Sequence, residues 1–163
     1  MKYVTTVEDK IELIRESFAS LVGKKLVGYE LAQLWVEEDK EWSDWMDLPL
    51  FICIGGSTLS ISWQKFDDLA IENGRVLPFA LCGSTVRWLC DKVEALDKIV
   101  GRKIVSVSLG RGDMSIGEAE VEIWTRLLIE FTGGHTLEIF NALDENGVEV
   151  RTVPIVGETR KCI

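Results

Sequence analysis

A six-residue block occurs twice in this chain, and this repetition limits the possible folds more than any other feature. Val22-Gly23-Lys24-Lys25-Leu26-Val27 recurs 78 positions later as Val100-Gly101-Arg102-Lys103-Ile104-Val105. At the same offset residues 50–61 fall on residues 128–139, with Gly-Gly, Thr, Leu and Ile positions matching. Self-similarity of this kind identifies a repeated structural unit. We therefore interpret the chain as a tandem internal duplication.

Each copy is predicted to begin with a helix. Apolar residues at spacings of three and four predict a first helix over residues 7–21, and Thr6 followed by Asp9 resembles a capping box at its start. A second apolar stripe, formed by Leu89, Val93, Leu96 and Val100, predicts a helix over residues 86–99.

Antiparallel strands are predicted after each helix, because the apolar period changes there from 3.6 to 2. Residues 103–109 and 118–123 alternate in this way, and Gly55-Gly56 and Gly133-Gly134 predict tight hairpin turns. Asn73-Gly74 and Asn146-Gly147 are interpreted as corresponding positions of the two copies.

The predicted fold class is α+β, with two helix-plus-antiparallel-β-meander units related by pseudo-two-fold symmetry. Repeat one spans 1–82 and repeat two spans 83–163, and together they form a single compact domain over 1–163. Each unit alone would be thin, so we expect the two to share one core. One continuous sheet and two sheets around a common core are both compatible with the sequence.

The charge of the chain restricts its partners. The 163 residues contain 18 basic and 27 acidic side chains, which gives a formal net charge of −9. A negative field repels nucleic acids and anionic membranes and attracts basic partners. No segment resembles a signal peptide or reaches membrane-spanning length, so we expect a cytoplasmic protein with reduced cysteines and with neither nucleic acid nor membrane as a direct partner.

No catalytic residue, cofactor or metal is predicted. His135 is the only histidine, and we interpret it as a polar residue beside the Gly-Gly turn. The carboxylates are numerous enough for a Mg²⁺ site, but their placement argues against one. Glu118, Glu120 and Glu122 alternate with apolar residues and share a face with Trp124, which indicates an outward acidic face on a strand.

The most unusual segment is 35–47, which combines three tryptophans and six carboxylates with one lysine. The residues that we predict to bind a partner there are Trp35, Glu37, Glu38, Asp39, Glu41, Trp42, Asp44, Trp45 and Asp47, with Glu118, Glu120 and Glu122 as a second contribution. Indole rings supply contact area, and carboxylates pair with Lys and Arg of a basic surface. Burial of these tryptophans in the core is an equally good interpretation.

The first half of the chain is the more acidic one. Residues 1–78 contain 8 basic and 14 acidic side chains, whereas residues 79–163 contain 10 and 13. The tryptophan-rich segment lies in this first half, which is therefore the better candidate for a partner surface.

In its tryptophan-rich acidic loops, its acidity and its strand-turn-strand units such as residues 127–139, the chain resembles the bacterial immunity proteins of polymorphic or contact-dependent toxin systems. The resemblance implies tight binding to a cognate toxin domain, commonly a basic nuclease, whose active site or substrate face the immunity protein covers. Two alternatives stay open: a small-molecule-binding or enzymatic protein with a pocket between the repeats, and a structural or regulatory homodimer.

Overall fold

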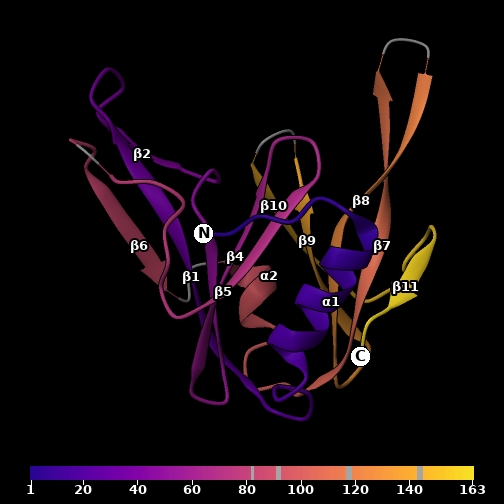
Figure 1. Cartoon of the computed structure of the whole chain (residues 1–163). Coiled ribbons are helices and arrows are strands. Elements are labelled where there is room, and N and C mark those ends of the chain that lie inside the picture. The colour runs from indigo at the N-terminus through magenta and orange to yellow at the C-terminus, as the bar shows by residue number, and fades with distance from the viewer. Residues whose placement is uncertain (82, 91–92, 117–118, 143–144) are drawn as a thin grey trace.

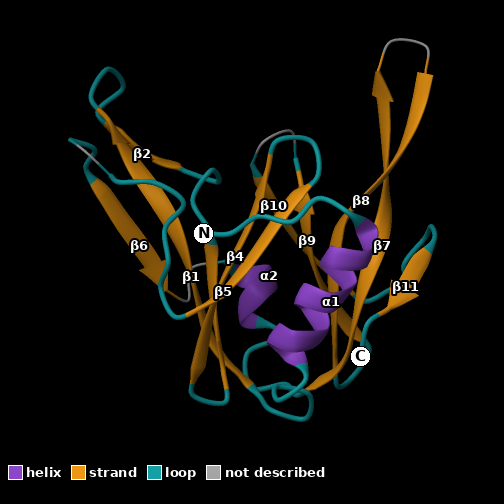
Figure 2. Ribbon diagram, viewed as in Figure 1, coloured by secondary structure: helices purple, strands orange, loops and turns teal. Residues whose placement is uncertain are grey.

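Two antiparallel sheets with two short helices between them make up the structure, a computed structural model that describes residues 1–81, 83–90, 93–116, 119–142 and 145–163 (Figures 1 and 2). In the first sheet the strand order is β2-β1-β3-β4-β5, and β6 also pairs with β1. These strands are β1 (Leu26–Val36), β2 (Glu41–Asp44), β3 (Leu50–Ile54), β4 (Ser57–Gln64), β5 (Asp68–Asn73) and β6 (Val86–Cys90).

The second sheet has the order β10-β9-β8-β7-β11. Its strands are β7 (Ile104–Ile116), β8 (Ala119–Phe131), β9 (His135–Asn141), β10 (Asn146–Arg151) and β11 (Thr159–Lys161). The two helices are α1 (Val7–Phe18) and α2 (Glu94–Asp97). Neither is long and apolar enough to cross a membrane.

The predicted fold class is wrong, because the structure is mostly β and is not a pair of helix-plus-meander units. The first helix forms: Thr6 is its N-cap and accepts a hydrogen bond from the Asp9 N–H at 3.1 Å, but the helix ends at Phe18 instead of residue 21.

The second predicted helix, over residues 86–99, is the main error. Its first five residues form β6, which pairs antiparallel with residues 30–34 of β1, and among the described residues of this range only Glu94–Asp97 is helical. The apolar spacing of residues 86–90 favours a helix, but β1 offers these residues five backbone pairing positions. They form a strand because this tertiary pairing overrides the local helical preference. β6 thus joins the first sheet, although it lies beyond the predicted repeat boundary at residue 82.

The repeated six-residue blocks pair with each other where the two sheets meet. Gly23 N–H donates to the Ile104 carbonyl at 2.9 Å, and Gly101 N–H donates to the Leu26 carbonyl at 2.8 Å. Between these bonds Lys25 and Lys103 lie directly opposite each other in an isolated antiparallel bridge.

Both Gly-Gly segments form hairpin turns, as predicted. Gly55 and Gly56 have φ values of 55° and 91° and connect β3 to β4. Gly133 and Gly134, at 87° and 73°, connect β8 to β9 in a loop one residue longer. These positive φ values are strained for residues with a side chain.

The interpretation of Asn73-Gly74 and Asn146-Gly147 as corresponding positions is wrong. Asn73 pairs with Leu59 at the end of β5, whereas Asn146 pairs with Asn141 at the start of β10.

One apolar core connects both sheets and both helices, with members such as Phe18, Leu96, Trp63 and Ile129. Buried Asn146 joins the sheets by polar contacts: its Oδ1 accepts from the Trp63 N–H at 2.7 Å, and its Nδ2 donates to the carbonyls of Met46 (2.8 Å) and Leu48 (3.0 Å). The Trp63 indole N–H donates to the Ile139 carbonyl at 3.0 Å. The relative position of the two sheets is therefore fixed by directional bonds as well as by apolar packing.

Candidate functional site: the acidic arm

Residues 35–47, which we call the acidic arm, form the end of β1, the turn that follows it, β2 and the link toward β3. The arm extends away from the core at the upper left of Figure 1. At its tip Glu37, Glu38, Asp39 and Glu41 are all exposed. Within the described part of the chain these four carboxylates form no ion pair or hydrogen bond through their side chains, and together with exposed Lys40 they give the tip a net charge of about −3.

Below the tip two of the predicted tryptophans pack against each other. Trp35 and Trp42 lie opposite each other across the β1–β2 hairpin, with ring centroids 5.5 Å apart in an edge-to-face arrangement. Arg87, from β6, places its guanidinium carbon 4.2 Å from the Trp42 ring centroid. Edge-to-face and cation–π contacts each stabilise such a pair by about 0.5–1.5 kcal/mol.

Arg87 also links β6 to β1 and, through Gln33, to β2. Its guanidinium donates to the Gln33 Oε1 at 2.6 and 2.9 Å, and the Gln33 Nε2 donates to the Asp44 Oδ1 at 2.7 Å. Sequence reasoning missed Arg87, because it assigned the residue to a helix in the other repeat. The run Val86-Arg87-Trp88-Leu89-Cys90 has no polar–apolar alternation, so no local strand signal identified it.

The base of the arm is held by a third tryptophan. The Trp45 indole N–H donates to the Asp47 Oδ2 at 2.9 Å, and the ring lies 5.9 Å from the ring of Phe79. Asp44 and Asp47 thus have partners inside the protein, whereas the four tip carboxylates do not. Trp35, Trp42 and Trp45 are all half-buried, so they belong neither to the core nor to a fully exposed surface.

The second predicted acidic group does not join the arm. Glu120 and Glu122 belong to the β7–β8 hairpin, which projects at the opposite side of the view in Figure 1, and their backbones lie opposite Ser115 and Asp113. Glu118 lies outside the described residues. Trp124, expected to share an outward face with them, is only 8% exposed.

A shallow groove of about 430 Å³ borders the arm between residues 34–38 and residues 83–85. The Trp35 N–H donates to the Thr85 carbonyl at 2.9 Å across its floor. A partner side chain could enter this groove next to Glu37 and Glu38.

Metal and catalytic features are sparse. Among the described residues no group of three or more His, Cys, Asp or Glu is placed to hold a metal ion. His135 Nδ1 lies 3.0 Å from the Gly133 carbonyl in its own hairpin.

Fold and site define the chain as a mostly β protein of two antiparallel sheets that carries an acidic, tryptophan-rich hairpin arm. No family model, curated protein or solved structure matches it.

Proposed function

We propose that this chain is an immunity-type protein that binds and neutralises a basic protein toxin through its acidic arm. The observation that carries the proposal is the tip, where exposed carboxylates without internal partners stand on a hairpin fixed by the Trp35–Trp42–Arg87 stack. The proposal includes the cytoplasmic location expected from the sequence.

Four physical properties support this function. The tip carboxylates can pair with Lys or Arg of a partner without first breaking an ion pair inside the protein. The net charge of −9 also increases the association rate with a basic protein. The hairpin is already held by ring and guanidinium contacts, so little further ordering is required on binding. The half-buried indole edges beside the charges provide apolar contact area.

The test compares three tagged proteins in affinity capture from the native host. The tip variant carries Glu37→Lys, Glu38→Lys and Glu41→Lys. The control variant carries the same change of charge at exposed positions outside the arm, Glu16→Lys, Glu94→Lys and Glu145→Lys. We expect wild type and control to retain a basic protein that the tip variant loses.

The captured protein is then purified and co-expressed with each variant. We expect its Kd for the tip variant to rise at least tenfold, as an estimate from charge-pair couplings of about 1.5–7 kcal/mol, and its toxicity to be relieved by wild type and control only. Equal affinity for the tip variant, or a captured partner that is not basic, would contradict the proposal.

A further inference from the structure

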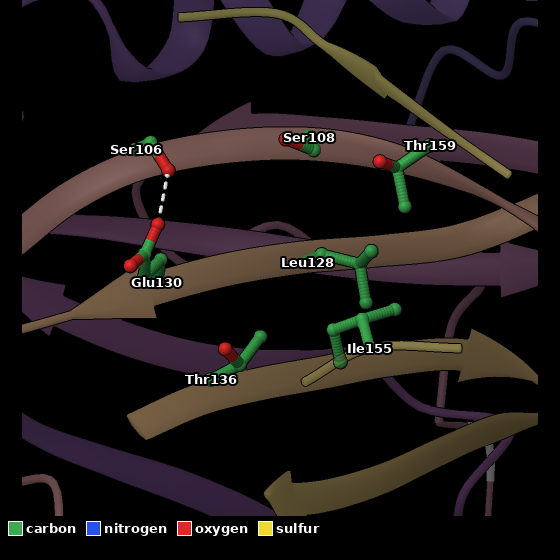
Figure 3. Close-up of a pocket in the computed structure, with 7 residues that line it drawn as sticks. All are labelled: Ser106, Ser108, Leu128, Glu130, Thr136, Ile155 and Thr159. Atoms are coloured by element: carbon green, nitrogen blue, oxygen red, sulfur yellow. Dashed lines mark hydrogen bonds between the residues drawn. The ribbon is translucent and has the colours of Figure 1, made fainter. Parts of the chain in front are cut away.

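A small pocket lies on the outer face of the second sheet, away from the acidic arm. The pocket is open to solvent on one side and has a volume of about 110 Å³, and its lining residues are Ser106, Ser108, Leu128, Glu130, Thr136, Ile155 and Thr159 (Figure 3). A volume of this size holds several water molecules or a short ligand group.

The wall of the pocket is fixed by backbone contacts. After β10 the chain crosses the outer face of the sheet to reach β11, and the Arg126 guanidinium donates to the Val156 carbonyl at 2.9 Å. The Arg111 N–H donates to the Glu158 carbonyl at 2.9 Å. These bonds hold Ile155 against Leu128 at one end of the pocket (Figure 3).

In the first sheet, side chains occupy the position that corresponds to this pocket. There Glu30 lies opposite Phe51 on one neighbouring strand and Cys90 on the other. In the second sheet Ser108 lies in the same way opposite Leu128 and Lys161. Glu30 and Ser108 therefore occupy equivalent positions in the strand order and pairing register of their sheets.

In the first sheet this position is occupied by the guanidinium group of Arg75. Arg75 places its guanidinium carbon 4.5 Å from the Phe51 ring centroid and 5.2 Å from that of Trp88, and it forms an ion pair with Glu30. In the second sheet the smaller residues Leu128, Thr159 and Ser108 take the places of Phe51, Trp88 and Glu30, and none of the described residues that line the pocket is basic.

The pocket has a carboxylate of its own, Glu130, at a position different from that of Glu30 in the first sheet. The Ser106 hydroxyl donates to the Glu130 Oε2 at 2.8 Å, which leaves the other carboxylate oxygen available. The hydroxyls of Ser108, Thr136 and Thr159 have no hydrogen-bonding partner through their side chains within the described residues. One carboxylate and three hydroxyl oxygens can accept the three N–H bonds of an ammonium group, while Leu128 and Ile155 contact an alkyl chain.

We propose that this pocket binds a primary alkylammonium group. A guanidinium fits less well, since the pocket has no aromatic ring on which the planar group could stack as Arg75 does in the first sheet. Exposed Lys161, the cross-strand neighbour of Ser108, does not line the pocket, and its charge weakens the binding. The site is independent of the proposed toxin-binding function.

The test is a titration of the ¹⁵N-labelled full chain with n-butylammonium, followed by amide chemical shifts at constant ionic strength. 1-Butanol and butyrate serve as neutral and anionic probes of similar size. We expect saturable shifts at Ser106, Ser108, Glu130 and Thr136 with the ammonium alone, with a Kd on the order of millimolar.

Three variants test the roles of individual residues, each compared with wild type at amides outside the pocket to verify its fold. Glu130→Gln keeps the size but removes the charge, and we expect it to raise the Kd at least fivefold, an estimate from the greater strength of charge-assisted bonds. Thr159→Trp fills the space as Trp88 does and abolishes binding. Lys161→Gln lowers the Kd severalfold.

Absence of saturable shifts in wild type would overturn the proposal. So would equal affinity for 1-butanol, because the pocket would then recognise an alkyl chain or hydroxyl and not a cation. An unchanged Kd in folded Glu130→Gln would exclude the carboxylate as the recognising group.

Discussion

Lys10 is a fully buried cation between the two sheets, and three groups surround its ammonium. Its Nζ lies 3.2 Å from the Asp67 Oδ2 and 3.1 Å from the Trp124 carbonyl, and 5.6 Å from the Trp63 ring centroid. Burial lowers the pKa of Lys10 below its usual 10.5, and attraction to Asp67 opposes this shift. A lysine in this place connects α1 to both sheets.

This residue gives stability a pH dependence of known sign. Because the folded-state pKa of Lys10 is lowered, the native protein binds fewer protons than the unfolded chain between that pKa and 10.5. The free energy of unfolding therefore gains a contribution that rises with pH across this window. In Lys10→Met this contribution is absent.

We expect Lys10→Met to be destabilised by about 1–3 kcal/mol at pH 7, since the Trp124 carbonyl loses its donor and Asp67 loses its cation. The deficit relative to wild type should grow as pH rises toward 10.5. Urea denaturation of both proteins at several pH values measures it, and a difference independent of pH would contradict the assignment.

Asn146 is the second residue whose removal should affect stability strongly. Asn146→Ala leaves the Trp63 N–H and the Leu48 carbonyl without their Asn146 partner, whereas the Met46 carbonyl keeps the backbone N–H of residue 146, and we expect a loss of at least about 2 kcal/mol. Asn73→Ala is the matched control, because exposed Asn73 forms no side-chain hydrogen bond within the described residues, and its loss should stay within about 0.5 kcal/mol. Equal unfolding midpoints for the two variants would refute this difference.

Among the elements, hairpins were predictable from sequence and β6 was not. A Gly-Gly pair determines its turn through its own φ values, so Gly55-Gly56 and Gly133-Gly134 were placed correctly. β6 depends on pairing with β1, which lies more than 50 residues earlier in the chain, and no local pattern records that partner. The same non-local pairing explains why Arg87 was missed at the candidate site.

At the acidic arm, the sequence predicted that the tip carboxylates and Trp35 are neighbours, and they lie within one hairpin. It also grouped them with Glu120 and Glu122, which the topology carries into the other hairpin. Whether two acidic segments meet depends on the arrangement of the sheets, which composition does not encode.

Lys25 and Lys103 lie directly opposite each other in the bridge between the repeated blocks, and like charges directly opposite across strands are destabilising. We expect Lys103→Glu to raise the free energy of unfolding by about 0.2–1 kcal/mol, because an attractive pair replaces a repulsive one. Chemical denaturation measures the effect. The double variant Lys25→Glu with Lys103→Glu restores like charges and should lose the gain; a gain kept by the double variant would show that repulsion is not its cause.

Across the whole molecule, the acidic charge and the projecting arm predict salt-sensitive association. If the tip meets a basic partner, raising the ionic strength from about 0.01 M to 0.15 M shortens the Debye length from about 30 to 8 Å and should slow association far more than dissociation. Stopped-flow or surface-based kinetics with the captured partner measure both rates. An association rate unaffected by salt would be inconsistent with recognition by the tip.

The bonds of Asn146 to Met46 and Leu48 attach the base of the acidic arm to the opposite sheet. The arm consequently cannot swing at the link between β2 and β3 without breaking contacts to β10, and the second sheet restrains the tip of the arm through its base. Removing this anchor should weaken partner binding through lost rigidity while every contacting side chain stays in place. Asn146, buried between the sheets, would then influence the binding specificity of the β1–β2 hairpin.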